Sequence, residues 1–312
     1  MPPSRPRASN RLSAMKRVLK GLAITAGCLA AILVVAAAAV YGASESRYRK
    51  TYTVPAERLV MPTDSAAIAR GAHIAQSIGG CQECHGETLA GKPVLDDRAI
   101  GRVYAPNLTS GRGGIASLSD DDIARAIRHG VAPNGRALKI MPSSDFANLT
   151  DADLGAIVAY VRSRPAMDNV VPPVSVGPLG RALFLAGKLP ILHAERIDHG
   201  RVHAATITPA PTAEYGAYLA SVGCMGCHGP QFAGGHIASG PPDWPPAANL
   251  TAAGRLPQWD EAAFRRVLRE GKRPDGSTVN PVMPVRATTH LSDDEITALW
   301  LYLRTLPAVA TR

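Results

Sequence analysis

The chain has 312 residues, of which 46% are hydrophobic and 19% charged, and its formal net charge is +9. That charge lies at one end: residues 1–58 contain ten Lys and Arg against two Asp and Glu, and the rest contains 24 against 23. Because the body is nearly neutral, a basic nucleic-acid-binding surface is excluded, and a length of this order suggests two domains.

The first predicted element is a membrane anchor. Residues 21–43 form an uncharged, largely apolar stretch of 23 residues, and about 20 helical residues cross the hydrocarbon core. The preceding residues 1–20 carry six Lys and Arg and no acid, which predicts a cytoplasmic N-terminus. We expect a retained single-pass anchor in a bacterial inner membrane, followed by a linker at 44–63 and domains in the periplasm. A cleaved signal peptide, with small residues at 36–39, is the alternative.

Two pentapeptides of the form C-x-x-C-H follow, at residues 81–85 and 224–228. In this motif the cysteines form thioether bonds to a porphyrin and the histidine binds its iron. We expect two covalently bound haem c groups, with these attachment residues and proximal ligands: Cys81, Cys84 and His85, and Cys224, Cys227 and His228. Paired C-x-x-C sequences also suit zinc, but zinc ribbons bring the pairs together over roughly 12 to 20 residues. Here the pairs stand 143 residues apart.

The two motifs belong to a duplicated sequence. A Met-Pro pair follows each motif, with Met141 placed 56 residues after His85 and Met283 placed 55 residues after His228. An Asn-Leu-Thr triplet stands 34 residues before each of these methionines. One duplication accounts for all of these spacings.

The repeats predict two helical domains, at 64–165 and 212–308, and an all-α fold class with tandem domains after the transmembrane helix. Short helices lead into the haem motifs, and later helices begin at polar capping residues: Ser119, Thr150, Asp260 and Ser292. Because each copy has about 100 residues, its own core is modest. We therefore expect the porphyrin to complete the core, so that neither copy folds without haem.

Met141 and Met283 are the expected second axial ligands, because they occupy equivalent positions in the repeat. A thioether ligand favours reduced iron. The alternative is that both methionines only fill core space. Weaker candidates lack a counterpart in the other copy: Met61, His73, His129, His236 and His290. Two irons with His and Met ligands have no open position, so we expect an electron carrier without catalytic residues.

A proline-rich connector at 166–211 joins the two copies. Its apolar island at 179–192 is too short to span a membrane. We expect this island either to cover the interface between the domains or to rest on the bilayer surface.

The chain resembles class I cytochrome c domains, and more closely the cytochrome c subunits of membrane-bound alcohol, aldehyde and gluconate dehydrogenases. The likeness rests on the haem motifs, on Gly71 and Gly216 before them, and on the Asn-Leu-Thr and Met-Pro repeats. Those subunits usually hold three haems and are often anchored near the C-terminus, whereas this chain has two motifs and an N-terminal apolar segment. The resemblance implies that electrons enter at one haem, pass to the other and leave toward an acceptor.

The expected function is that of a membrane-anchored dihaem c-type cytochrome in a periplasmic respiratory chain. The expected donor is a membrane-bound dehydrogenase or a quinol, and the expected acceptor is an oxidase, a soluble cytochrome or a cupredoxin. One alternative is an integral dihaem subunit of a terminal oxidase complex. Another is a dihaem enzyme of the peroxidase or thiosulfate dehydrogenase type, whose open iron conflicts with the paired methionines.

Overall fold

The computed structural model describes residues 7–57, 59–237, 240 and 244–311. The first six residues of the predicted basic segment lie outside this range. The chain divides into two units, Met1–Arg47 and Tyr48–Arg312. Each unit is described by itself.

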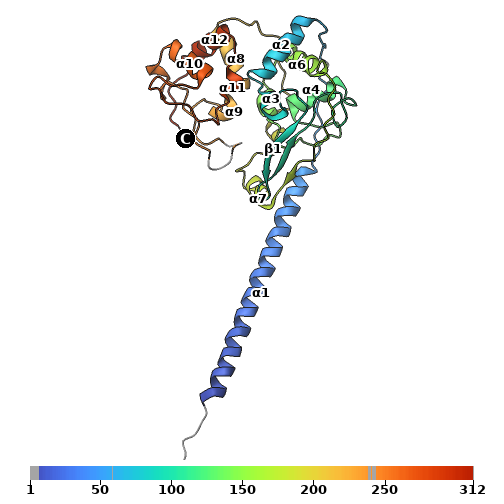
Figure 1. The fold of residues 1–312 in the computed structure, drawn as a ribbon, viewed down its shortest axis with the longest axis vertical. Helices are drawn as coiled ribbons and strands as arrows, with labels where there is room; N and C mark the ends of the chain where they lie inside the picture. The colour runs from blue at the N-terminus through green and yellow to red at the C-terminus, as the bar shows by residue number, and fades with distance from the viewer. Residues whose placement is uncertain (1–6, 58, 238–239, 241–243, 312) are drawn as a thin grey trace, which may run out of the picture. The chain divides into compact units, whose positions relative to one another are not determined.

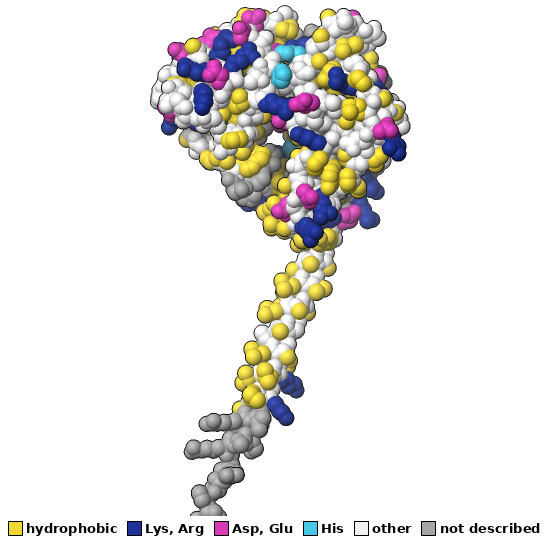
Figure 2. Space-filling model, in the orientation of Figure 1, with side chains coloured by type: hydrophobic (Ala, Val, Ile, Leu, Met, Phe, Trp, Pro, Cys, Tyr) yellow, Lys and Arg dark blue, Asp and Glu magenta, His cyan; other side chains and the backbone are white. Residues whose placement is uncertain are grey.

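The first unit is the greater part of one long helix, α1, which runs from Arg7 to Tyr48. Its section Ser13–Tyr48 contains an 18-residue window with a mean hydropathy of 2.5 and is long and apolar enough to cross a membrane. Hydrophobic side chains cover the surface of this helix (Figure 2), and Leu33 is 70% exposed. A helix that exposes apolar side chains in this way suits lipid better than water. Length and composition fit a membrane anchor, and they also fit a signal sequence.

The second unit contains two sets of helices in the same order (Figure 1). The first set is α2 (Ser65–Gln76), α3 (Cys81–His85), α4 (Asp120–His129), α5 (Ser143–Phe146) and α6 (Asp151–Arg162). The second set is α8 (Ala213–Gly223), α9 (Met225–His228), α10 (Glu261–Glu270), α11 (Val285–Thr288) and α12 (Asp293–Leu303). Short 3-10 helices occur at His193–Arg196 and Leu256–Gln258. The expected mainly helical class and the helices leading into the motifs are confirmed.

Two glycines allow the main helix pair of each domain to cross at very short range. A Cβ atom added to Gly71 of α2 would lie 1.9 Å from the carbonyl oxygen of Ala156 in α6. In the second domain, a Cβ atom on Gly216 of α8 would lie 1.9 Å from the carbonyl oxygen of Ala298 in α12. Because no side chain fits at that distance, glycine is required where the helix before each haem motif meets the last helix.

A small antiparallel sheet was not expected from the sequence. It consists of β1 (Lys92–Asp97), β2 (Gly101–Ala105) and β3 (Ser175–Val176), in that spatial order. Its strands are short and partly exposed, the register of the β1–β2 pair shifts between Pro93 and Leu95, and β3 joins from the connector long after β2. Such a pairing leaves little periodic signal in the sequence.

The connector packs on the first domain. Its helix α7 (Pro178–Leu185) places the buried Phe184 ring 5.2 Å from the ring of Tyr48, in a cluster with Ile191 and Leu192. The backbone N–H of Ile140 donates to the carbonyl of Ile191 (2.7 Å). The apolar island therefore covers the loop that precedes Met141, whereas the sequence favoured a position over the domain interface.

Candidate functional site

The two motif histidines have the same hydrogen bond. Nδ1 of His85 lies 2.8 Å from the carbonyl oxygen of Pro106, and Nδ1 of His228 lies 2.8 Å from that of Ala248. A carbonyl oxygen only accepts, so Nδ1 carries the proton and Nε2 keeps its electron pair. Burial lowers the pKa of both histidines and favours this neutral form. The geometry suits an imidazole that binds a metal through Nε2.

The cysteines of both motifs stand at positions that repeat between the domains, and none of them is in a disulfide. Burial raises the pKa of Cys81 and of Cys224 to about 12. Among the described residues, no group of three or more His, Cys, Asp or Glu side chains is arranged to hold a metal ion. A cysteine pair beside a neutral histidine fits covalent haem.

The two candidate methionines lie in loops with the same local turn. In each loop a backbone N–H two residues later donates to the methionine carbonyl at 2.8 Å, from Ser143 to Met141 and from Val285 to Met283. Both methionine side chains pack against the main hydrophobic core. Ile140 has a φ of +74°, which is strained for a β-branched residue. Such strain persists only where the surrounding structure enforces it, as is expected of a loop that places an iron ligand.

Two core residues next to the motifs were missed by the sequence analysis. Leu89 and Phe232 stand four residues after the motif histidines, are buried, and have φ values of +59° and +57°. Their carbonyls accept the N–H groups of Leu108 and Leu250, both at 2.8 Å. Because leucine and phenylalanine differ, only the spacing from the histidine marked them as equivalent.

The repeated Asn-Leu-Thr triplets close each domain. The side-chain amide of Asn107 donates to the carbonyl of Met167 (2.6 Å), and that of Asn249 donates to the carbonyl of Val309 (2.8 Å). In each triplet the asparagine oxygen accepts hydrogen bonds from the threonine two residues later. The triplet thus ties the loop after the haem motif to the chain that follows the last helix.

The two methionine loops, defined here as residues 141–145 and 283–286, each contact the haem motif of the other domain. Arg286, three residues after Met283, pairs with Glu87 (2.8 Å) and with Glu83 inside the first motif (3.8 Å). Asp145, four residues after Met141, fills the space beside Gly226 inside the second motif, where a Cβ atom would lie 2.2 Å from its carboxylate. The two candidate sites are therefore neighbours in one folded unit.

Buried polar side chains also join the two domains. Arg70 of α2 forms two 3.0 Å bonds to Asp153 of α6 and reaches Glu295 of α12 at 3.4 Å. Tyr218 of α8 donates to Asp153 at 2.5 Å, and Nε2 of His73 lies 2.7 Å from Glu295. Each carboxylate is bound by side chains from both domains, which fixes the domains in one relative position.

Glu295→Gln is expected to lower the free energy of unfolding at neutral pH by roughly 3 kcal/mol. Burial would raise the pKa of Glu295, but hydrogen bonds from His73, Ser292 and Tyr215 outweigh it and lower the pKa from 4.5 to about 2. A carboxyl lowered in this way stabilises the fold fully above pH 4.5 and loses that effect as the pH falls toward 2. Denaturant unfolding at several pH values should show a steeper acid loss in the wild type. The exposed Glu214→Gln is the control, and equal slopes would contradict the assignment.

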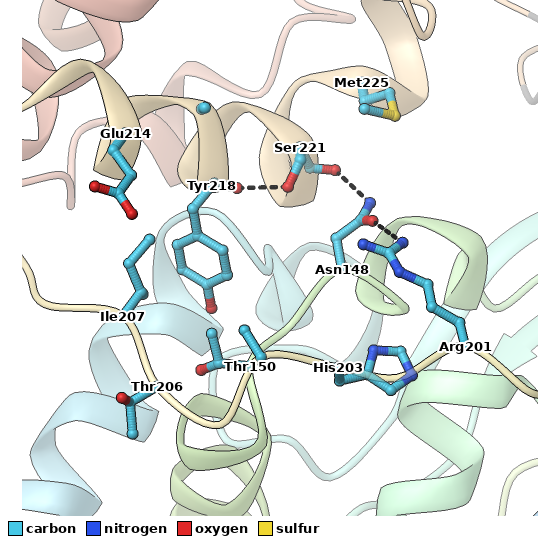
Figure 3. Close-up of a pocket in the computed structure, with 12 residues that line it drawn as sticks. Asn148, Thr150, Arg201, His203, Thr206, Ile207, Glu214, Tyr218, Ser221 and Met225 are labelled. Carbon is cyan, nitrogen blue, oxygen red and sulfur yellow. Dashed lines mark hydrogen bonds between the residues drawn. The ribbon is translucent and has the colours of Figure 1, made fainter.

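A cavity of about 450 Å³ lies where the two domains meet the connector. Figure 3 shows Asn148 between the two sides: its amide donates to the carbonyl of Ser221 (3.0 Å), and its oxygen accepts from Arg201 (2.8 Å). Met225 of the second motif also lines the cavity. Asn148 thus links the first domain to the helix that leads into the second motif.

Comparison with known proteins supports both domains. Residues 66–161 match the family model described as cytochrome c oxidase, cbb3-type, subunit III, and residues 213–307 match the one described as cytochrome c. The cytochrome c subunit of gluconate 2-dehydrogenase from Pantoea cypripedii is 30% identical over 274 residues, which cover 78% of this chain and 60% of that protein.

Two further relatives have related descriptions. The cytochrome c subunit of alcohol dehydrogenase (quinone) from Gluconobacter oxydans is 29% identical over 281 residues, or 79% of this chain and 56% of that protein. A diheme cytochrome c-type protein from Cereibacter sphaeroides is 26% identical over 262 residues, or 74% of this chain and 83% of that protein. The chain therefore spans less than two thirds of the length of the two dehydrogenase subunits.

Proposed function

Since the chain carries two cytochrome c domains and is homologous to cytochrome c subunits of gluconate and alcohol dehydrogenases, we propose that it is a membrane-anchored dihaem cytochrome. It transfers electrons in a periplasmic respiratory chain, from a membrane-bound dehydrogenase or quinol to an oxidase, a soluble cytochrome or a cupredoxin. Haem c in each domain would supply the one-electron couple of its iron. In this proposal α1 is retained as the anchor and holds the domains at the outer face of the bacterial inner membrane.

The residues of the chain have separate roles in this proposal. Cys81 and Cys84, and their counterparts Cys224 and Cys227, hold the porphyrin edges. His85 and His228 would bind the iron through Nε2, because their Nδ1 protons are bound to backbone carbonyls. Met141 and Met283 would be the second iron ligands and would exclude other ligands, so the chain would carry electrons and catalyse no reaction on a substrate.

One observation carries the proposal: each methionine loop contacts the haem motif of the other domain, through Arg286 and through Asp145. A domain that only bound haem for its own stability would need no such contact. Two redox sites held side by side in one folded unit suit the passage of electrons between partners.

Met141→Ala is expected to remove half of the weak red or near-infrared band that marks thioether ligation of oxidised haem c, and Met283→Ala the other half. The reason is that the two loops present their methionines in the same turn. Optical spectra of the oxidised holoprotein measure the band. Met61→Ala, which has no counterpart in the second copy, is the control and should leave the band at full strength. A band that keeps its full strength in both single variants would support the core-filling alternative.

The match of residues 66–161 to an oxidase-subunit model supports a second candidate, the dihaem subunit of a terminal oxidase complex. Affinity purification of the full chain from detergent-solubilised membranes distinguishes the two. Recovery with a dehydrogenase supports the first proposal, whereas recovery with copper and b-type haem supports the second.

A further inference from the structure

A chain of buried and half-buried ionisable side chains lies beside the loop that carries Met141. It joins Glu57, which precedes α2, to His129 at the end of α4 and to His199 in the connector. Nε2 of His129 lies 2.7 Å from Oε1 of Glu57, and Nδ1 of His129 lies 3.0 Å from Nδ1 of His199. The side chains of Glu57 and His129 are both only 5% exposed. Sequence analysis had considered His129 only as a weak iron ligand, and here it has another role.

The contacts of this chain allow one more proton. Nε2 of His129 and Oε1 of Glu57 approach to 2.7 Å, and two electron pairs would repel each other at that distance, so Nε2 of His129 carries a proton. The contact between the two Nδ1 atoms needs one proton, which His199 supplies when His129 is neutral. If Nε2 of His199 takes up a further proton, either ring can donate across the contact between the Nδ1 atoms, and this hydrogen bond is kept. The pair can therefore be charged or neutral in the same geometry.

The surrounding charges favour that added proton. Arg128, a permanent cation, pairs with Glu57 and with Asp151 (2.9 Å), which leaves one negative charge among these three groups. The other titratable groups that face the imidazoles are Tyr52, Asp198, Arg201 and His203. Burial lowers the pKa of His199 and of His203, so protonation is expected below pH 6.5. Burial would raise the pKa of Glu57, but His129 and Arg128 outweigh it and keep this carboxylate ionised.

The scaffold of this cluster also holds the Met141 loop. The hydroxyl of Ser143 donates to the carbonyl of Ala126 in α4 (3.0 Å), and Gly130, next to His129, meets the Ser143 side chain. Ile140 is bound to the connector through Ile191. In the second domain the helix position of His129 is taken by the exposed Glu270. The second domain has no histidine at this position, so it serves as an internal control for the effect of His129 and its partners.

We propose that Glu57, His129 and His199 form a redox-linked proton-binding site of the first domain. This inference rests on the proposed function, because it requires an iron whose charge changes. When the iron of the first domain gains one electron, His199 takes up part of one proton from solvent, and oxidation releases it. By linkage, the reduction equilibrium shifts by the same factor as the proton affinity of this site, which is about three- to tenfold for a change of half to one pKa unit. The potential of the first site therefore falls as the pH rises, while that of the second stays constant.

The test is proton uptake by the full-length holoprotein in detergent, reduced in weakly buffered solution with a pH-indicator dye. Between pH 5 and 7 the wild type should take up a fraction of one proton per chain. His199→Gln keeps a donor for His129 but cannot titrate, and it should abolish the uptake. The exposed His290→Gln in the second domain is the matched control and should retain it. Full uptake in His199→Gln, or none in the wild type, would overturn the proposal.

Two further measurements distinguish a failure of the proposed function from a failure of the proton-binding site. Spectroelectrochemical titration should show one of two midpoint potentials falling with pH in the wild type and neither in His199→Gln. Nitrogen NMR of the His199 ring should show a higher pKa in the reduced than in the oxidised protein. If the chain lacks covalent haem or methionine ligation, the proposed function itself fails. If both are present and the ring titrates identically in both redox states, only the proton site is wrong.

Discussion

Replacing Cys81 and Cys84 by alanine is expected to remove one covalent porphyrin from the mature chain and to unfold the first domain. The thioether bonds hold the haem, and the haem completes a protein core that is modest for a domain of about 100 residues. Mass spectrometry should find two porphyrin adducts in the wild type and one in the variant, and circular dichroism should show a large loss of helix.

The same change at Cys224 and Cys227 should affect the second domain in the same way. Because buried residues of both domains belong to one hydrophobic cluster, each double variant should also weaken the intact domain. Cys28→Ala, in α1, is the matched control and should keep both adducts. A double variant that retains full helicity would show that the protein core is sufficient without haem.

Gly216→Ala is expected to destabilise the second domain by at least about 3 kcal/mol, because overpacking against backbone cannot be relieved by a rotamer change. The new Cβ atom would lie 1.9 Å from the carbonyl oxygen of Ala298 and 2.9 Å from Cβ of Tyr302. The helices must separate, which weakens the packing beside the second haem motif. Denaturant unfolding followed by haem absorbance and by circular dichroism measures the effect.

Gly200→Ala is the control for this substitution. Gly200 is exposed, and the nearest atom to its added Cβ would lie 3.6 Å away, which is ordinary contact. Its unfolding free energy should stay within about 0.5 kcal/mol of the wild type. If Gly216→Ala behaves like Gly200→Ala, the close crossing of α8 and α12 is not needed for the fold.

Local features of the molecule could be predicted from sequence because each depends on residues near one another in the chain. The capping boxes at Ser119 and Ser292 mark helix starts, and Gly130 and Gly271 end α4 and α10 in the left-handed conformation. The repeated haem motifs and Met-Pro pairs identified the domains and the candidate iron ligands. The roles of those ligands stay predictions that the spectra and masses above test.

Contacts between distant residues could not be predicted. The pairing of β3 with β2 and the packing of α7 on the first domain bring together segments with weak patterns of their own. The partners of the motif loops, Arg286 with Glu83 and Asp145 with Gly226, come from opposite domains. A repeat predicts two similar domains but not the face on which they meet.

The amino-acid sequence alone therefore established the cofactor class, the duplication, the mainly helical fold and the apolar N-terminal helix, because these follow from short motifs and local periodicity. Three-dimensional folding was required to show that each methionine loop rests on the opposite motif and that Glu57, His129 and His199 contact one another. Those arrangements depend on side chains far apart in the sequence. Burial gives such contacts their strength, and burial exists only after the domains and the connector have packed together.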